Sequence, residues 1–80
     1  MVEVAGITYT FTMGSDVDRD GMYLEAAITG SPSEVVAEVF YSDASGRFAV
    51  SCFKESIPIE VLEHLIAEAR RRLPPQVGSA

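Results

Sequence analysis

Apolar and polar residues follow two different periods along the chain. Within Val2–Met13, apolar side chains alternate with threonines from Ile7 onward, which is the two-residue period of a half-buried β-strand. From Ile57 to Leu73 the period lengthens to three and four residues, which is that of an amphipathic helix. The apolar face of this helix comprises Leu62, Leu65, Ile66, Ala69 and Leu73. The chain therefore predicts a β-sheet followed by one helix that packs on it.

Clusters of turn-forming residues divide the alternating region into four strands. Gly14–Gly21 is the longest polar stretch and predicts a hairpin loop, Gly30–Ser33 contains both Gly and Pro, and Asp43–Gly46 has the pattern of a type I turn. The predicted strands cover about residues 4–13, 22–29, 34–42 and 47–54, and the helix covers about 58–73. Residues 74–80 are predicted to be a frayed tail.

These elements predict a single α+β domain over residues 1–80. Strands joined by short connections pair with their neighbours in the chain, which gives a four-stranded antiparallel β-meander. The C-terminal helix, with Pro58 in its first turn, is expected to pack on one face of the sheet. Leu65 and Ile66 lie in the middle of the apolar helical face, and we expect both to anchor the helix.

The sheet face turned away from the helix is predicted to be partly apolar. The solvent side of a sheet covered by one helix is usually polar, and the threonines of the first strand fit that rule. The later strands depart from it, since alternation places large apolar side chains on this face: Tyr23, Val36, Phe40 and Phe53. A contiguous apolar patch is typical of a protein contact, so we expect a homodimer joined through it. The alternative is that register shifts bring some of these residues under the helix, or that they are scattered over the face.

Charge and cysteine content limit the kinds of partner and the cellular location. The net charge is −6, and residues 1–40 carry seven acids against the single base Arg19. This balance disfavours nucleic acid and favours a basic protein as a further partner. The single cysteine, Cys52, excludes an intramolecular disulfide and suits a reducing compartment. The chain shows neither a signal peptide nor an apolar run long enough for a membrane, which predicts a cytoplasmic protein.

One stretch has the composition of a cation-binding loop. Asp16, Asp18, Asp20 and Gly21 form the pattern D-x-D-x-D-G, in which alternate carboxylates can converge on Ca²⁺ or Mg²⁺. The helical calcium loop also needs a bidentate Glu at its twelfth position, which here is Ala27, so that motif is excluded. A solvated acidic hairpin loop explains the same residues without a metal.

The residues that could carry catalysis do not form a recognisable site. His64 is predicted on the solvent side of the helix, and Cys52 is expected to be a small buried residue of the last strand. The run Arg70–Arg72 complements the dipole at the end of the helix, with Glu68 paired to Arg72, or offers a contact for an anion. We therefore predict no catalytic residue and no cofactor.

The order of strands and helix, with the segments AEVFYSDASGRF and IPIEVLEHLI, resembles small uncharacterised bacterial proteins of the mobile-cassette and toxin-immunity kind. That resemblance implies a binding role and assigns no functional residue. The four-strand-plus-helix order is also similar to the single-strand-binding repeats of the Pur and Whirly families. Those repeats need basic side chains on the open sheet face, where this sequence has the acidic residues Glu25 and Glu38.

The sequence favours a non-enzymatic, homodimeric protein-interaction module. An alternative is a small-molecule-binding or enzymatic domain whose pocket lies between sheet and helix or at the dimer seam. Binding of single-stranded nucleic acid is a third interpretation, which the negative charge disfavours.

Overall fold

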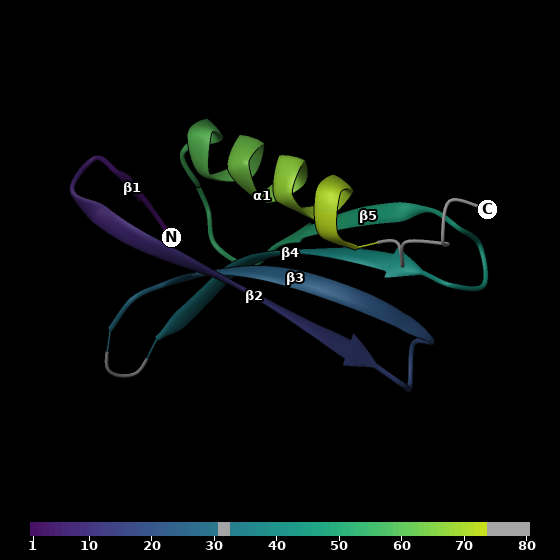
Figure 1. Ribbon diagram of the computed structural model, residues 1–80. Coiled ribbons are helices and arrows are strands. Elements are labelled where there is room, and N and C mark those ends of the chain that lie inside the picture. The colour runs from purple at the N-terminus through teal and green to yellow at the C-terminus, as the bar shows by residue number, and fades with distance from the viewer. Residues whose placement is uncertain (31–32, 74–80) are drawn as a thin grey trace.

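The computed structural model describes residues 1–30 and 33–73. It contains one antiparallel sheet with strands in the order β1-β2-β3-β4-β5 and one C-terminal helix, α1, laid over one face (Figure 1). The elements are β1 (Val2–Val4), β2 (Ile7–Asp16), β3 (Gly21–Ile28), β4 (Glu34–Ser42), β5 (Phe48–Cys52) and α1 (Ile59–Arg72). The α+β meander with a C-terminal helix is confirmed, but it has five strands and not four. The predicted tail 74–80, and part of the predicted turn Gly30–Ser33, lie outside the described residues.

The additional strand comes from a turn inside the stretch predicted as one strand. Ala5 and Gly6 both have positive φ, 53° and 79°, as the central residues of a type I′ hairpin turn do. The chain reverses there, so that Val4 lies opposite Ile7 and β1 pairs with β2. Gly6 adopts this backbone without strain, whereas Ala5 does not, so the residue pair Ala-Gly does not by itself predict a turn.

Helix α1 packs on the sheet through residues spaced four apart. Val61, Leu65, Ala69 and Leu73 are buried against β3 and β4, where Leu24, Ala26, Ala37 and Val39 form the facing layer. Leu62 is half-buried, and Ile66 is 39% exposed. The predicted apolar face was therefore correct for Leu65 and wrong for Ile66, because the helix is rotated so that Val61 faces the sheet instead.

A β-bulge changes the face on which one predicted contact residue lies. Ala26 pairs with Ala37 and Ala27 with Val35, which leaves Val36 as an extra residue of β4. The two strand residues of such a bulge both point to one side of the sheet, and Val36 joins Ala37 in the core, where it is 1% exposed. The prediction that Val36 lies on the open face is therefore wrong.

The hairpin between β2 and β3 is shorter than predicted, because the strands continue into the polar stretch as far as Asp16 and Gly21. Gly21 is required by a close approach: a Cβ atom there would lie 2.1 Å from the backbone oxygen of Tyr41. Gly14 likewise lies beside the ring of Tyr23, whose hydroxyl oxygen would be 2.4 Å from an added Cβ. A side chain at either position would therefore collide with the neighbouring strand.

Candidate functional site

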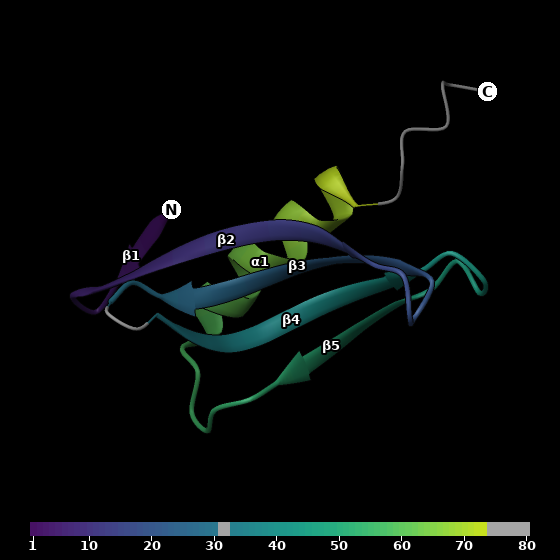
Figure 2. The same cartoon turned by 90° about the horizontal axis from the view of Figure 1, so that it is seen from below.

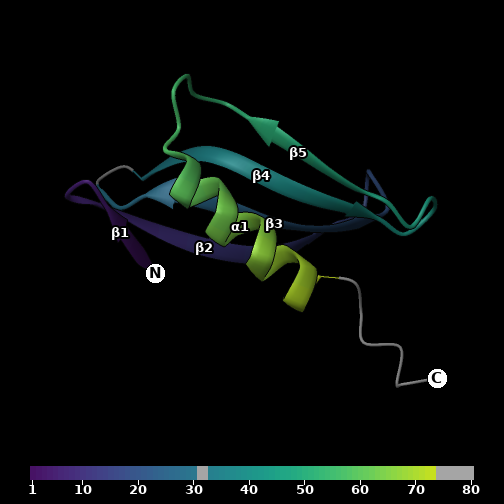
Figure 3. The ribbon, with the colours of Figure 1, turned by 90° about the horizontal axis from the view of Figure 1, so that it is seen from above.

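Strand β5 is the least covered element of the sheet. Helix α1 packs on β1, β3 and β4, and seen from above it crosses the sheet to one side of β5 (Figure 3). Ala49, Val50, Ser51 and Cys52 are all exposed, Val50 by 51%. The prediction that Cys52 is buried is wrong, because α1 packs on β3 and β4 and does not cover the end of β5 that carries this residue.

An apolar hollow of about 150 Å³ separates α1 from β5. We call it the edge groove. Its lining residues are Val39, Phe48, Ala49, Val50, Ile66, Ala69 and Arg70. The ring of Phe48 contacts the ring of Tyr41, at a centroid distance of 5.1 Å, and its centroid lies 5.6 Å from the guanidinium carbon of Arg70. Ile66, which is 39% exposed, contributes to the helical wall of this groove together with Ala69 and Arg70.

The outer edge of β5 presents backbone groups for a further strand. Two hydrogen bonds fix the pairing phase with β4: Ser42 N donates to Arg47 O (3.1 Å), and Phe53 N donates to Val36 O (2.8 Å). Hydrogen-bonded pairs alternate along an antiparallel ladder, so the backbone N–H and C=O groups of the odd-numbered residues of β5 point toward β4. Within the residues that the structure describes, the N–H and C=O groups of Phe48, Val50 and Cys52 consequently point outward.

The two edges of the sheet differ in how they are protected against further pairing. Strand β1 has only three residues, and the exposed Glu3 stands at its centre. Short length and a central charge are devices by which sheet edges avoid association. Strand β5 has five uncharged residues, no proline and an uninterrupted register with β4. The segment from Phe48 to Phe53 also lacks any charge in the sequence, which is the signal that could have identified this edge.

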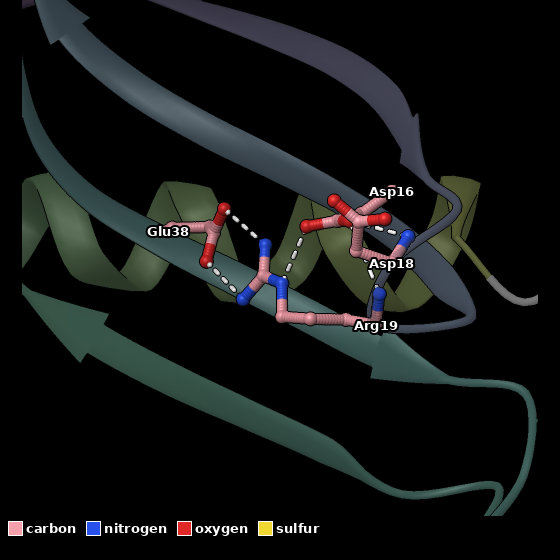
Figure 4. A network of polar contacts seen from close by, with 4 residues as sticks. All are labelled: Asp16, Asp18, Arg19 and Glu38. Atoms are coloured by element: carbon pink, nitrogen blue, oxygen red, sulfur yellow. Dashed lines mark hydrogen bonds and ion pairs between the residues drawn. The ribbon is translucent and has the colours of Figure 1, made fainter.

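The open sheet face is partly covered by its own side chains. Figure 2 looks onto this face, with α1 behind the sheet. Figure 4 shows Arg19, which reaches from the β2–β3 loop to Glu38 on β4 with Nη1–Oε1 and Nη2–Oε2 distances of 3.1 and 3.0 Å. Its guanidinium carbon lies 4.2 Å from the ring centroid of Phe40. This arrangement covers Phe40 and places a cation beside Glu38, which stands directly opposite Glu25.

The predicted contact surface is therefore not one exposed patch. Phe53 is 59% exposed, whereas Tyr23 and Phe40 are half-buried and Val36 is in the core. The largest uncovered apolar side chains around the sheet edge are Val50, Phe53 and Ile66. The structure thus brings together β5 and α1, a combination that alternation within single strands does not reveal.

Hydrogen bonds to the carboxylate of Asp16 organise the acidic loop. Oδ1 of this carboxylate accepts the backbone N–H groups of Asp18 (3.1 Å) and Arg19 (3.2 Å), and its Oδ2 accepts Nε of Arg19 (2.5 Å). The hydrogen bond from the Arg19 side chain holds the pKa of Asp16 below its ordinary value, and Glu38 with Asp16 raises the pKa of Arg19. Among residues 1–30 and 33–73, no three His, Cys, Asp or Glu side chains are placed to hold a metal ion. Asp16, Asp18 and Asp20 are thus not gathered into a ligand set.

The remaining candidate groups lie apart. Cys52 is exposed on β5, and His64 is exposed on α1 beside Glu60 and Glu63. Glu68 pairs with Arg71 one turn along the helix, and not with Arg72 as predicted. Arg70 instead lies over Phe48 at the rim of the edge groove.

Comparisons with known proteins found no matching family model, curated protein or solved structure. Within the described residues, no helix has both the length and the apolar character needed to cross a membrane.

Proposed function

We propose that this protein is a non-enzymatic protein-interaction module that works as a homodimer, and that its contact surface is the edge groove together with the free edge of β5. The observation that carries this proposal is the uncovered strand: five residues without charge or proline, with outward backbone groups and exposed apolar side chains. Monomeric proteins usually protect such an edge, and β1 at the other side of the sheet is protected.

The local charge supports a second copy as the occupant. Two chains of net charge −6 repel each other wherever carboxylates face each other. Residues 44–54 contain no acid, and the charge of Lys54 is balanced by Glu34 at 3.2 Å. Two copies can therefore approach through β5 without placing carboxylates opposite each other. The open face gives less support, because Glu25 and Glu38 lie there and Arg19 covers Phe40.

Two further aspects of the proposal follow from charge and volume. A β5 contact leaves the acidic open face free, and a basic protein partner would bind on that side through Asp18 and Glu25. The small-molecule alternative has less support, because the edge groove of about 150 Å³ and the hollow of about 180 Å³ beside Ile57 are both smaller than the ~300–1,000 Å³ of typical ligand pockets.

Sedimentation from low micromolar to several hundred micromolar protein tests the proposal. We expect a concentration-dependent shift from monomer to dimer mass. Val50→Lys and Ile66→Lys should weaken the dimer, because each places a charge in the edge groove while changing a side chain that already contacts solvent. Thr12→Lys, on the exposed open face, is the matched control and should leave the dimer intact. A constant monomer mass, or sensitivity to Thr12→Lys alone, would contradict the proposal.

A further inference from the structure

We infer that the two copies join by antiparallel pairing of β5 with β5 of the second copy, about a two-fold axis through Val50, so that the two five-stranded sheets form one continuous sheet. This inference rests on the proposed homodimer and adds to it the mode of contact and the register.

The orientation follows from symmetry. A two-fold axis perpendicular to a sheet relates two edge strands that run in opposite directions, and it places one residue of the strand opposite its own copy. The outward-facing residues Phe48, Val50 and Cys52 supply the backbone groups for such a ladder. The axis can therefore lie on any residue of β5, and the side chains decide which one.

An axis through Val50 pairs more residues of β5 than any other position of the axis. It pairs all five residues of β5, whereas every other axis leaves at least two of them beyond the overlap. It places Phe48 opposite Cys52 of the second copy and Ala49 opposite Ser51, so that the one bulky ring meets a small side chain. Arg47 then lies opposite the uncharged Phe53 of the second copy, and no like charges face each other within the strand.

The pairing also accounts for the edge groove. Phe48 and Val50 stand opposite Tyr41 and Val39 of β4, so their side chains lie on the face of the sheet that carries α1. The two helices therefore lie on the same face of the joined sheet, and each Ile66 faces the seam across its own groove. A five-residue strand is only ~17 Å long, so the contact is small and the dimer is expected to dissociate in the micromolar range.

A single-cysteine scan locates the axis. In a Cys52→Ser background, cysteine is placed in turn at positions 48, 49, 50 and 51, and the native Cys52 serves as the fifth position. Each variant is equilibrated in a glutathione redox buffer at a concentration where sedimentation of the Cys52→Ser protein detects dimer, and the disulfide-linked fraction is measured on a non-reducing gel. Thr12→Cys in the same background, on the open face, gives the level of collisional cross-linking.

We expect Val50→Cys to give at least a tenfold larger linked fraction than Thr12→Cys, because the Cα atoms of a residue and its copy on the axis lie ~5.5 Å apart. The native Cys52 should stay at the collisional level, because the two copies of residue 52 are four residues apart along the ladder, ~14 Å, beyond disulfide reach. Circular dichroism of each variant confirms that it is folded.

The outcomes separate this inference from the function on which it rests. A dimer whose cross-linking is greatest at another position, or at the collisional level throughout, contradicts pairing about Val50 and leaves the homodimer standing. A chain that stays monomeric in sedimentation contradicts both and leaves β5 for a strand of a different protein.

Discussion

Substituting Leu65 and its neighbour Ile66 by alanine tests how α1 is rotated on the sheet. The two side chains are isomers in adjacent positions, and alanine removes the same number of carbons from each. Leu65 is 0% exposed in the layer between α1 and the sheet, whereas Ile66 is 39% exposed at the wall of the edge groove. The free energy of unfolding should therefore respond to the two substitutions by different amounts.

The magnitudes follow from burial. At ~0.8 kcal/mol for each buried carbon, the three carbons that Leu65→Ala removes account for ~2.4 kcal/mol of transfer free energy. The cavity left beneath a buried helix adds to this, which gives a total loss of ~3–5 kcal/mol. Ile66→Ala removes three carbons that are only partly buried and lie beside an open groove, so ~1–1.5 kcal/mol is expected. A domain of this length has a total stability of ~4–12 kcal/mol, so Leu65→Ala should remove much of it.

Urea melts followed by circular dichroism measure these losses. They are performed at a protein concentration where the chain sediments as a monomer, because Ile66 belongs to the proposed dimer contact. Glu63→Ala, an exposed position of the same helix, is the control and should change the stability by less than ~0.5 kcal/mol. Equal losses for Leu65→Ala and Ile66→Ala, or a larger loss for Ile66→Ala, would refute the observed rotation of the helix.

Two further predictions concern the hairpin loop and the open face. Gly21→Ala should destabilise the fold by more than ~2 kcal/mol in thermal or urea melts, since its Cβ would lie 2.1 Å from the backbone oxygen of Tyr41. The control Gly46→Ala, with φ of 71° and its nearest contact at 3.9 Å, should cost only ~1 kcal/mol. A loss for Gly21→Ala no greater than that for Gly46→Ala would contradict the close approach. Arg19 lowers the pKa of Asp16 in the folded state. The ionised Asp16 therefore stabilises the fold above the ordinary aspartate pKa of ~3.9, and this stabilisation is lost as the pH falls below that value. Arg19→Met should therefore flatten the dependence of the melting temperature on pH between about pH 4 and pH 2, and identical slopes in both proteins would show that the pair does not contribute.

The two sides of the molecule differ in what they offer a partner. On the open face, Arg19 bonds to both Asp16 and Glu38 and covers the ring of an aromatic residue. These polar and aromatic groups therefore already have partners within the chain. On the helix side, α1 leaves most of β5 uncovered, and Val50 on this strand is 51% exposed. This difference is the reason why the proposed contact is at the sheet edge and not on the sheet face.

Local pattern was sufficient to predict the elements but not their exact environment. Alternation identified β2, β3 and β4 to within a few residues, because side chains on a strand alternate between faces whatever surrounds them. The three- and four-residue period identified α1 for the same local reason. The two-residue turn at Ala5–Gly6 was missed, since Ala5 adopts a positive φ that its own side chain disfavours and that the pairing of β1 with β2 maintains.

Tertiary structure decided most of what concerns the candidate site. The bulge at Val36 moves that residue into the core, because an extra residue in one strand interrupts the alternation on which the face assignment depended. Arg19 finds Glu38 nineteen residues away along the chain, a distance over which sequence pattern gives no contact information. The exposure of β5 depends on where the axis of α1 crosses the sheet, and that position is set by Val61 and Leu65 packing over β3 and β4. Sequence thus determined which residues form strands and helix, whereas the packing of the helix on the sheet determined which strand remained uncovered.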